Sequence, residues 1–241
     1  MPKYNKYIIE TITIPFNFNK ELNKMSNNIH TLIFDGHFDQ EIKENILPKN
    51  LHTLLVGWWF NQEIKVNVLP NSLYTIEFGT HFNQEIKENV LPNNLHRLLF
   101  GWNFNQELKE NVLPKTLHTL IFGYKFNQEI KENVLPESLN VIVFGCSFNK
   151  EITKNVLPMS IKKINLFSHC NLINNLPLYL EEVYINFFKF DEYNKEVTNL
   201  PATLEKIIIK NEIYLKHITK IPFGCNVVIK KFEYFPPTQY M

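Results

Sequence analysis

Residues 82–103 read FNQEIKENVLPNNLHRLLFGWN, and close copies of this 22-residue unit lie on both sides of it. Three of its residues return at the same spacing along the chain. They are the proline (Pro48, Pro70, Pro92, Pro114, Pro136 and Pro158), the first phenylalanine (Phe38, Phe60, Phe82, Phe104, Phe126 and Phe148) and the glycine (Gly57, Gly79, Gly101, Gly123 and Gly145). A fixed period of this length is typical of proteins built from stacked repeats, each packed only against its neighbours.

The second half of the unit carries a strand pattern. Leu98 and Phe100 alternate with Arg97 and Leu99, which is the period of two expected for a half-buried strand. Equivalent inward pairs are Ile12/Ile14, Leu32/Phe34, Leu54/Val56, Ile76/Phe78, Leu120/Phe122, Ile142/Phe144, Ile164/Leu166, Val183/Ile185 and Ile207/Ile209. Val227/Ile229 fits only with a one-residue shift. The sequence therefore predicts ten strands and leaves an eleventh open.

A unit of 22 residues is too short for a strand, a return helix and two turns, but it suffices for one coil with a strand and an irregular return path. We therefore expect an all-β, leucine-rich-repeat-like solenoid of 22-residue coils with one parallel sheet and degenerate capping ends. Residues 1–37 would form an N-terminal cap with the first irregular repeats, 38–158 the regular repeats, and 159–241 the degenerate repeats and C-terminal cap.

The periodic residues suggest structural roles. We expect the glycines to turn the chain with a positive φ and the prolines to lie outside the strand ladder. The phenylalanines should stack into a core spine. Two asparagine columns should satisfy backbone groups at bends, namely Asn61, Asn83, Asn105, Asn127 and Asn149, and Asn45, Asn67, Asn89, Asn111, Asn133 and Asn155.

Composition restricts the class of protein. The chain has 241 residues, 25 Lys and Arg against 24 Asp and Glu, and three scattered cysteines. This near-neutral charge disfavours a nucleic-acid footprint, and no apolar run is long enough to cross a membrane. The sparse cysteines argue against a disulfide framework and favour an intracellular, cytoplasmic location.

The Phe104-Asn105, Leu108 and Pro114 positions, repeated one coil later, resemble the FNIP repeat family. The spacing of Leu95, Leu98 and Phe100 also resembles the strand of leucine-rich repeats. The resemblance implies a leucine-rich-repeat-like fold, a role in protein recognition, no catalytic residue and no cofactor. Members often carry an F-box before the repeats, but few residues precede the first strand here, which argues against an F-box.

The outward strand positions are the main candidate for a binding site. They read Thr31/Ile33, Thr53/Leu55, Thr75/Glu77, Arg97/Leu99, Thr119/Ile121 and Val141/Val143. A long apolar strip of this kind typically marks a partner site. The alternative is that these residues only favour strands and that the chain termini cover the sheet. We expect a protein partner to bind Ile33, Leu55, Glu77, Arg97, Leu99, Ile121 and Val143.

Three further columns carry polar or aromatic side chains. Trp58, Trp59, Trp102 and Tyr124 follow the turn, and the sequence does not decide whether they face solvent. The histidines His30, His52, His96 and His118 lack a companion column to complete a metal site, so we expect no metal. Stacked glutamates (Glu41, Glu63, Glu85, Glu107, Glu129 and Glu151) and lysines (Lys43, Lys65, Lys87, Lys109 and Lys131) should form the solvated back of the solenoid.

The sequence thus predicts a non-catalytic protein-recognition scaffold. Two alternatives remain open: a single-stranded nucleic-acid binder that uses the aromatic strip, and an enzyme with a site in the irregular C-terminal third. The second lacks a catalytic constellation, since His169 and His217 are isolated in the sequence. The oligomeric state is left open.

Overall fold

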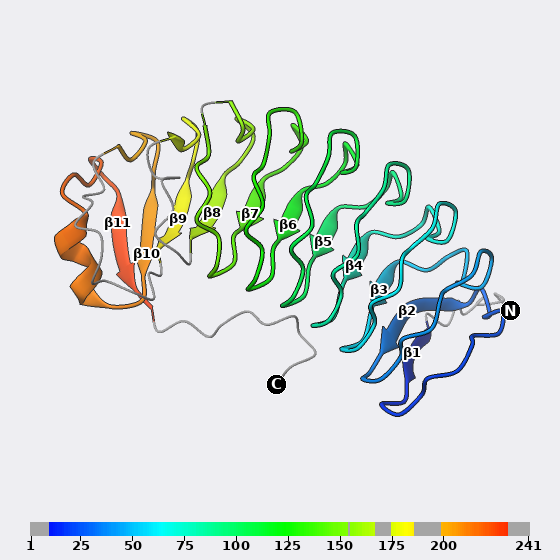
Figure 1. The fold of residues 1–241 in the computed structure, drawn as a ribbon. Helices are drawn as coiled ribbons and strands as arrows, with labels where there is room; N and C mark the ends of the chain where they lie inside the picture. The colour runs from blue at the N-terminus through cyan, green and yellow to red at the C-terminus, as the bar shows by residue number, and fades with distance from the viewer. Residues whose placement is uncertain (1–9, 154, 167–174, 186–198, 231–241) are drawn as a thin grey trace, which may run out of the picture.

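The computed structural model describes residues 10–153, 155–166, 175–185 and 199–230. These residues form one parallel sheet of 11 strands whose order follows the chain, and the coils trace an arc (Figure 1). The strands are β1 (Glu10–Ile14), β2 (Ile29–Phe34), β3 (Thr53–Leu55), β4 (Thr75–Glu77), β5 (Arg97–Leu99), β6 (Thr119–Ile121), β7 (Val141–Val143), β8 (Lys163–Leu166), β9 (Glu182–Ile185), β10 (Lys206–Ile209) and β11 (Asn226–Ile229).

This architecture confirms the predicted all-β solenoid with one parallel sheet. The strand that the sequence left open also forms, because β11 pairs with β10 and places Val227 beside Ile207. The described residues also include an element that was not predicted, the 3-10 helix η2 (Glu212–His217), which follows β10 and begins with the Asn211 side chain accepting from the Ile213 N–H.

The core contains a double aromatic stack beside its aliphatic side chains. Phe82 lies 6.2 Å from Phe104 between ring centroids, and Phe104 lies 6.1 Å from Phe126, with the rings nearly parallel. Phe100, from the end of the strand, packs 3.7 Å from Phe104 across the coil. Phe104 is fully buried, so the predicted phenylalanine spine is confirmed. Each pair of phenylalanines adds a large buried apolar area to a thin coil.

The glycine column has a different cause from the one we expected. Among the described glycines only Gly36 and Gly224 have a positive φ, so a left-handed turn does not explain Gly57 to Gly145. A Cβ built on Gly101 would instead overlap the carbonyl of Gly79 and lie 2.8 Å from the Phe78 oxygen. The prediction of positive φ was therefore wrong. Glycine is needed because successive coils approach each other through their backbones at this turn.

The left-handed conformation belongs to the second asparagine column. Asn45, Asn67, Asn89, Asn111, Asn133 and Asn155 have φ between 62° and 73°. Asparagine tolerates this region better than most residues with a side chain. The prolines follow in the next turn, where the Pro92 carbonyl accepts from the Leu95 N–H at 3.1 Å, and they lie outside the strands as predicted.

The first asparagine column forms the expected ladder between coils. The Asn83 Oδ1 accepts from the Asn105 N–H at 2.8 Å, and the Asn105 Oδ1 accepts from the Asn127 N–H at 2.8 Å. Asp39 serves the same purpose for Asn61. Gln84 and Gln128 side chains add a second donor to the asparagine of the preceding coil. These half-buried bends thereby have their backbone N–H groups satisfied.

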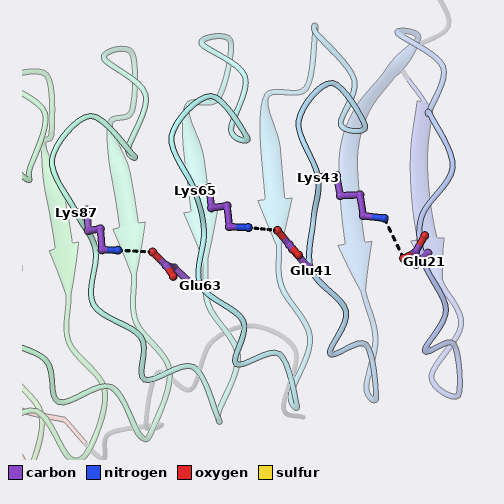
Figure 2. Close-up of polar contacts among 6 residues, drawn as sticks. All are labelled: Glu21, Glu41, Lys43, Glu63, Lys65 and Lys87. Carbon is purple, nitrogen blue, oxygen red and sulfur yellow. Dashed lines mark hydrogen bonds and ion pairs between the residues drawn. The ribbon is translucent and has the colours of Figure 1, made fainter.

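The back of the solenoid carries the charged columns, paired between coils as Figure 2 shows. Lys65 lies 2.6 Å from Glu41, and Lys87 lies 2.6 Å from Glu63. The hydrogen bond from each lysine lowers the pKa of Glu41 and Glu63. Because these side chains are largely exposed, the pairs neutralise the like-charge columns rather than hold the fold together.

Candidate recognition surface

The sheet displays two columns of side chains on the face opposite the core. Strand register sets Thr31, Thr53, Thr75, Arg97 and Thr119 side by side in the first column. The second column, which we call the outward column, comprises Thr13, Ile33, Leu55, Glu77, Leu99, Ile121, Val143, Asn165, Tyr184, Ile208 and Val228. The seven residues chosen from the sequence all lie in these two columns.

Exposure differs along this surface. Ile33, Leu55, Leu99 and Ile121 are half-buried, and Arg97 is exposed. Glu77, between Leu55 and Leu99, is buried, with 4% of its surface exposed. The accessible part of the surface is therefore an apolar strip bordered by threonines and one arginine.

The C-terminal part of the outward column was missed by the sequence reasoning. Tyr184 and Ile208 are buried there in a second apolar cluster with Val143, Cys146 and Val228, separate from the core. The signal was available, since both residues stand between inward residues of strands that the sequence identified. Beside this cluster, Glu182 lies 3.7 Å from Lys163 and 3.5 Å from Lys206. In this part of the first column, paired charged side chains therefore occupy the positions that threonines occupy in the regular coils.

The sequence left the orientation of the aromatic strip after the turn undecided; its three tryptophans face solvent, and Tyr124 is half-buried. Trp58, Trp59 and Trp102 expose 40%, 47% and 42% of their surfaces. Trp102 stacks on Tyr124 at 4.2 Å with the rings 3° from parallel, and Trp59 stacks on His81 at 4.3 Å. Because each ring already occupies the face of its neighbour, no slot for a nucleobase lies between these pairs.

The histidine column is a continuous ring stack at the beginning of the strands. His30 and His52 lie 4.6 Å apart, His52 and Tyr74 5.0 Å, Tyr74 and His96 4.2 Å, and His96 and His118 4.9 Å. Burial, and then the neighbouring His30, lower the pKa of His52. His52 is therefore more readily neutral than an isolated histidine would be.

Side chains arranged for metal binding or for nucleophilic catalysis are sparse along the part of the chain that the structure describes. There, no group of three or more His, Cys, Asp or Glu could hold a metal ion. Burial raises the pKa of Cys146 to about 11, which leaves its thiol protonated at neutral pH. His169 and the side chain of His217 lie outside the described residues.

Within the described ranges, no helix is both long enough and apolar enough to span a bilayer.

Comparisons with known proteins agree with the repeat geometry. The crystal structure of CroV588, described as a novel circular LRR protein, is 36% identical to this chain with a TM-score of 0.74. That match covers 90% of this chain and 36% of CroV588, so the chain spans about a third of the length of that protein. A structure of the pneumococcal vaccine antigen PcpA is 16% identical over 85% of this chain and 63% of PcpA, and its TM-score of 0.25 supports no argument.

No curated protein matches the chain. The model of the FNIP Repeat family, in contrast, matches residues 4–57, 38–81, 82–125, 126–169 and 148–188. Repeat families with leucine-rich-repeat-like folds are typically non-catalytic scaffolds. The matches span most of the chain and include the coils that form the apolar strip, so this protein belongs to the FNIP repeat family.

Proposed function

We propose that this protein is a non-catalytic recognition scaffold that binds a protein partner through the outward face of its sheet. The proposed contact comprises Ile33, Leu55, Arg97, Leu99, Ile121 and Val143, with the buried Glu77 in the middle of this patch. The observation that carries the proposal is the register, which aligns half-buried apolar side chains on adjacent strands.

A surface of this kind is suited to binding for two reasons. The strands hold the side chains in fixed positions, so little conformational freedom is lost when a partner docks. The apolar column also lies beside threonines and Arg97, which resembles the apolar centre and polar rim of protein interfaces. Arginine is enriched at such interfaces.

The test is to introduce two negative charges, Leu99→Asp with Ile121→Asp, and to capture partners on the immobilised protein from a cell extract. The two residues pair across β5 and β6, so both charges fall within one contact patch. A partner would have to desolvate them, which is prohibitive for unpaired charges. We expect capture of every protein held by the parent to be lost, while the thermal melt stays close to that of the parent.

The matched control makes the same net charge change on the back, with Lys87→Gln and Lys109→Gln, where the native lysines pair with Glu63 and Glu85. This variant should retain the partners. If the Leu99 and Ile121 variant captures the same proteins as the parent, the outward face is not the contact. If it unfolds instead, the column has a structural role and the proposal also fails.

A further inference from the structure

Among the described residues, the core is less covered at the two ends of the solenoid than in its middle. In the middle of the array the inward residues Leu98 and Phe100 are 0% and 1% exposed. Their equivalents in β11 are Val227, which is half-buried, and Ile229, which is 47% exposed. In β1, the inward isoleucines at positions 12 and 14 are also only half-buried. The inward-facing apolar side chains are therefore partly exposed at both ends of the arc, which Figure 1 shows as β1 and β11.

The backbone N–H groups on the free edges of the two terminal strands point in the directions that strand pairing within the sheet uses. Within the array, the N–H of an inward residue donates to the following strand, as Phe78 does to the Leu99 carbonyl at 2.8 Å. The N–H of an outward residue donates to the preceding coil, as Thr75 does to the His52 carbonyl at 3.1 Å. This alternation directs the N–H groups of Val227 and Ile229 off the far edge of β11, and that of Thr13 off the near edge of β1.

The terminal strands contain few of the residues that normally protect a sheet edge, and Glu10 is the one charged residue within them. Native edges are often blunted by lysine or proline. Here β11 reads NVVI and β1 reads ETITI, with no lysine or proline in either strand. In the described sheet β11 pairs only with β10 and β1 only with β2. Phe223, just before β11, is fully exposed, and Ile221 is 42% exposed.

We propose that the β11 end of one molecule binds the β1 end of a second copy, with β11 and β1 paired in parallel as successive strands are within the chain. The contact continues the established coil-to-coil packing, because inward columns, strand polarity and edge N–H groups all match. It uses two different surfaces, so it is heterologous and produces a ring or a filament according to whether the arc closes. This contact between copies does not involve the outward face, so it is independent of the proposed recognition function.

The experiment removes one edge donor at a time. Thr13→Pro deletes an N–H that points away from β2, and Ile229→Pro deletes one that points away from β10, so each leaves the internal pairing intact. Thr13→Val and Ile229→Val keep the donors and serve as matched controls. Mass is measured by light scattering after size-exclusion chromatography over a concentration series, and thermal melts establish that each variant is folded.

The parent and both valine controls should reach at least twice the 28.6 kDa of the monomer as concentration rises. Each proline variant alone should remain monomeric. It keeps only one intact end, and a head-to-tail contact needs an intact β11 end on one molecule and an intact β1 end on the other. A mixture of the two proline variants should form dimers, because Thr13→Pro supplies an intact β11 end and Ile229→Pro an intact β1 end.

A parent that stays at 28.6 kDa at every concentration overturns the proposal. So does a proline variant that still associates alone, which would indicate a symmetric contact between like ends, and so does a mixture that stays monomeric. If Ile229→Pro unfolds, Phe223→Asp replaces it in the same scheme, because Phe223 is fully exposed and its charge is compatible with the monomer.

Discussion

Replacing Gly101 with alanine is the sharpest test of how the coils are spaced. The added Cβ would overlap the Gly79 carbonyl and lie 2.8 Å from the Phe78 oxygen. All of these neighbours are backbone atoms, so no side-chain rotation can relieve the contact. The two coils must separate locally, which strains the Asn103 N–H to Thr80 carbonyl bond, now 2.9 Å long.

The expected cost combines two contributions. Overpacking a rigid site costs about 1–3 kcal/mol, and weakening one backbone hydrogen bond costs about 1 kcal/mol. We therefore expect a loss of about 2–4 kcal/mol in the free energy of unfolding, measured by urea denaturation. For a chain of this length the melting temperature should fall by roughly 5–15 °C.

Two controls separate close approach from backbone conformation. At Gly224, no heavy atom of the described residues other than its chain neighbours lies within 4 Å of a built Cβ, but φ is +79°, so Gly224→Ala should show only the left-handed strain of about 1–2 kcal/mol. Gly101→Asn should be as damaging as Gly101→Ala. Parent-like stability in Gly101→Asn alone would mean that conformation matters, and parent-like stability in both Gly101 variants would refute the close approach.

Two further predictions concern the side-chain columns. Asn105→Ala should cost about 1–3 kcal/mol in urea denaturation, because the half-buried Asn127 N–H loses its acceptor; Asn105→Asp should be nearly neutral, as Asp39 already fills this position, and equal losses in both variants would contradict the ladder. His52 has a pKa in the folded state below its ordinary value, so the unfolded chain binds more protons and stability should fall as pH drops from 7 towards 5. His52→Tyr, which repeats the residue found at Tyr74 in the same stack, should reduce that fall in melting temperature, and an unchanged pH profile would exclude His52 as a cause.

The architecture was predictable because the strongest signals are periodic. The phenylalanine and proline spacing indicates a solenoid, and the alternation around Leu98 and Phe100 places the strands. The cause of the glycine column was not predictable, since a glycine at positive φ and a glycine under a neighbouring carbonyl look the same in a sequence. Only the distance between coils distinguishes the two explanations.

The candidate surface was predictable in position but not in accessibility. Register placed all seven chosen residues on the outward face, because side chains alternate along a strand. The burial of Glu77 depends on tertiary surroundings that local alternation does not encode. Tyr184 and Ile208 lie beyond the regular repeats and were missed, although the inward residues on either side of each already place its side chain on the outward face.

The direction of the side-chain ladder has a consequence for how the protein is made. The backbone N–H groups of Asn61, Asn83, Asn105 and Asn127 each donate to a side chain from the coil before, and Lys65 and Lys87 also reach back to earlier glutamates. A coil emerging from the ribosome therefore meets its acceptors on chain that has already been synthesised. Assembly can advance from the N-terminus one coil at a time, each folded coil serving as the template for the next.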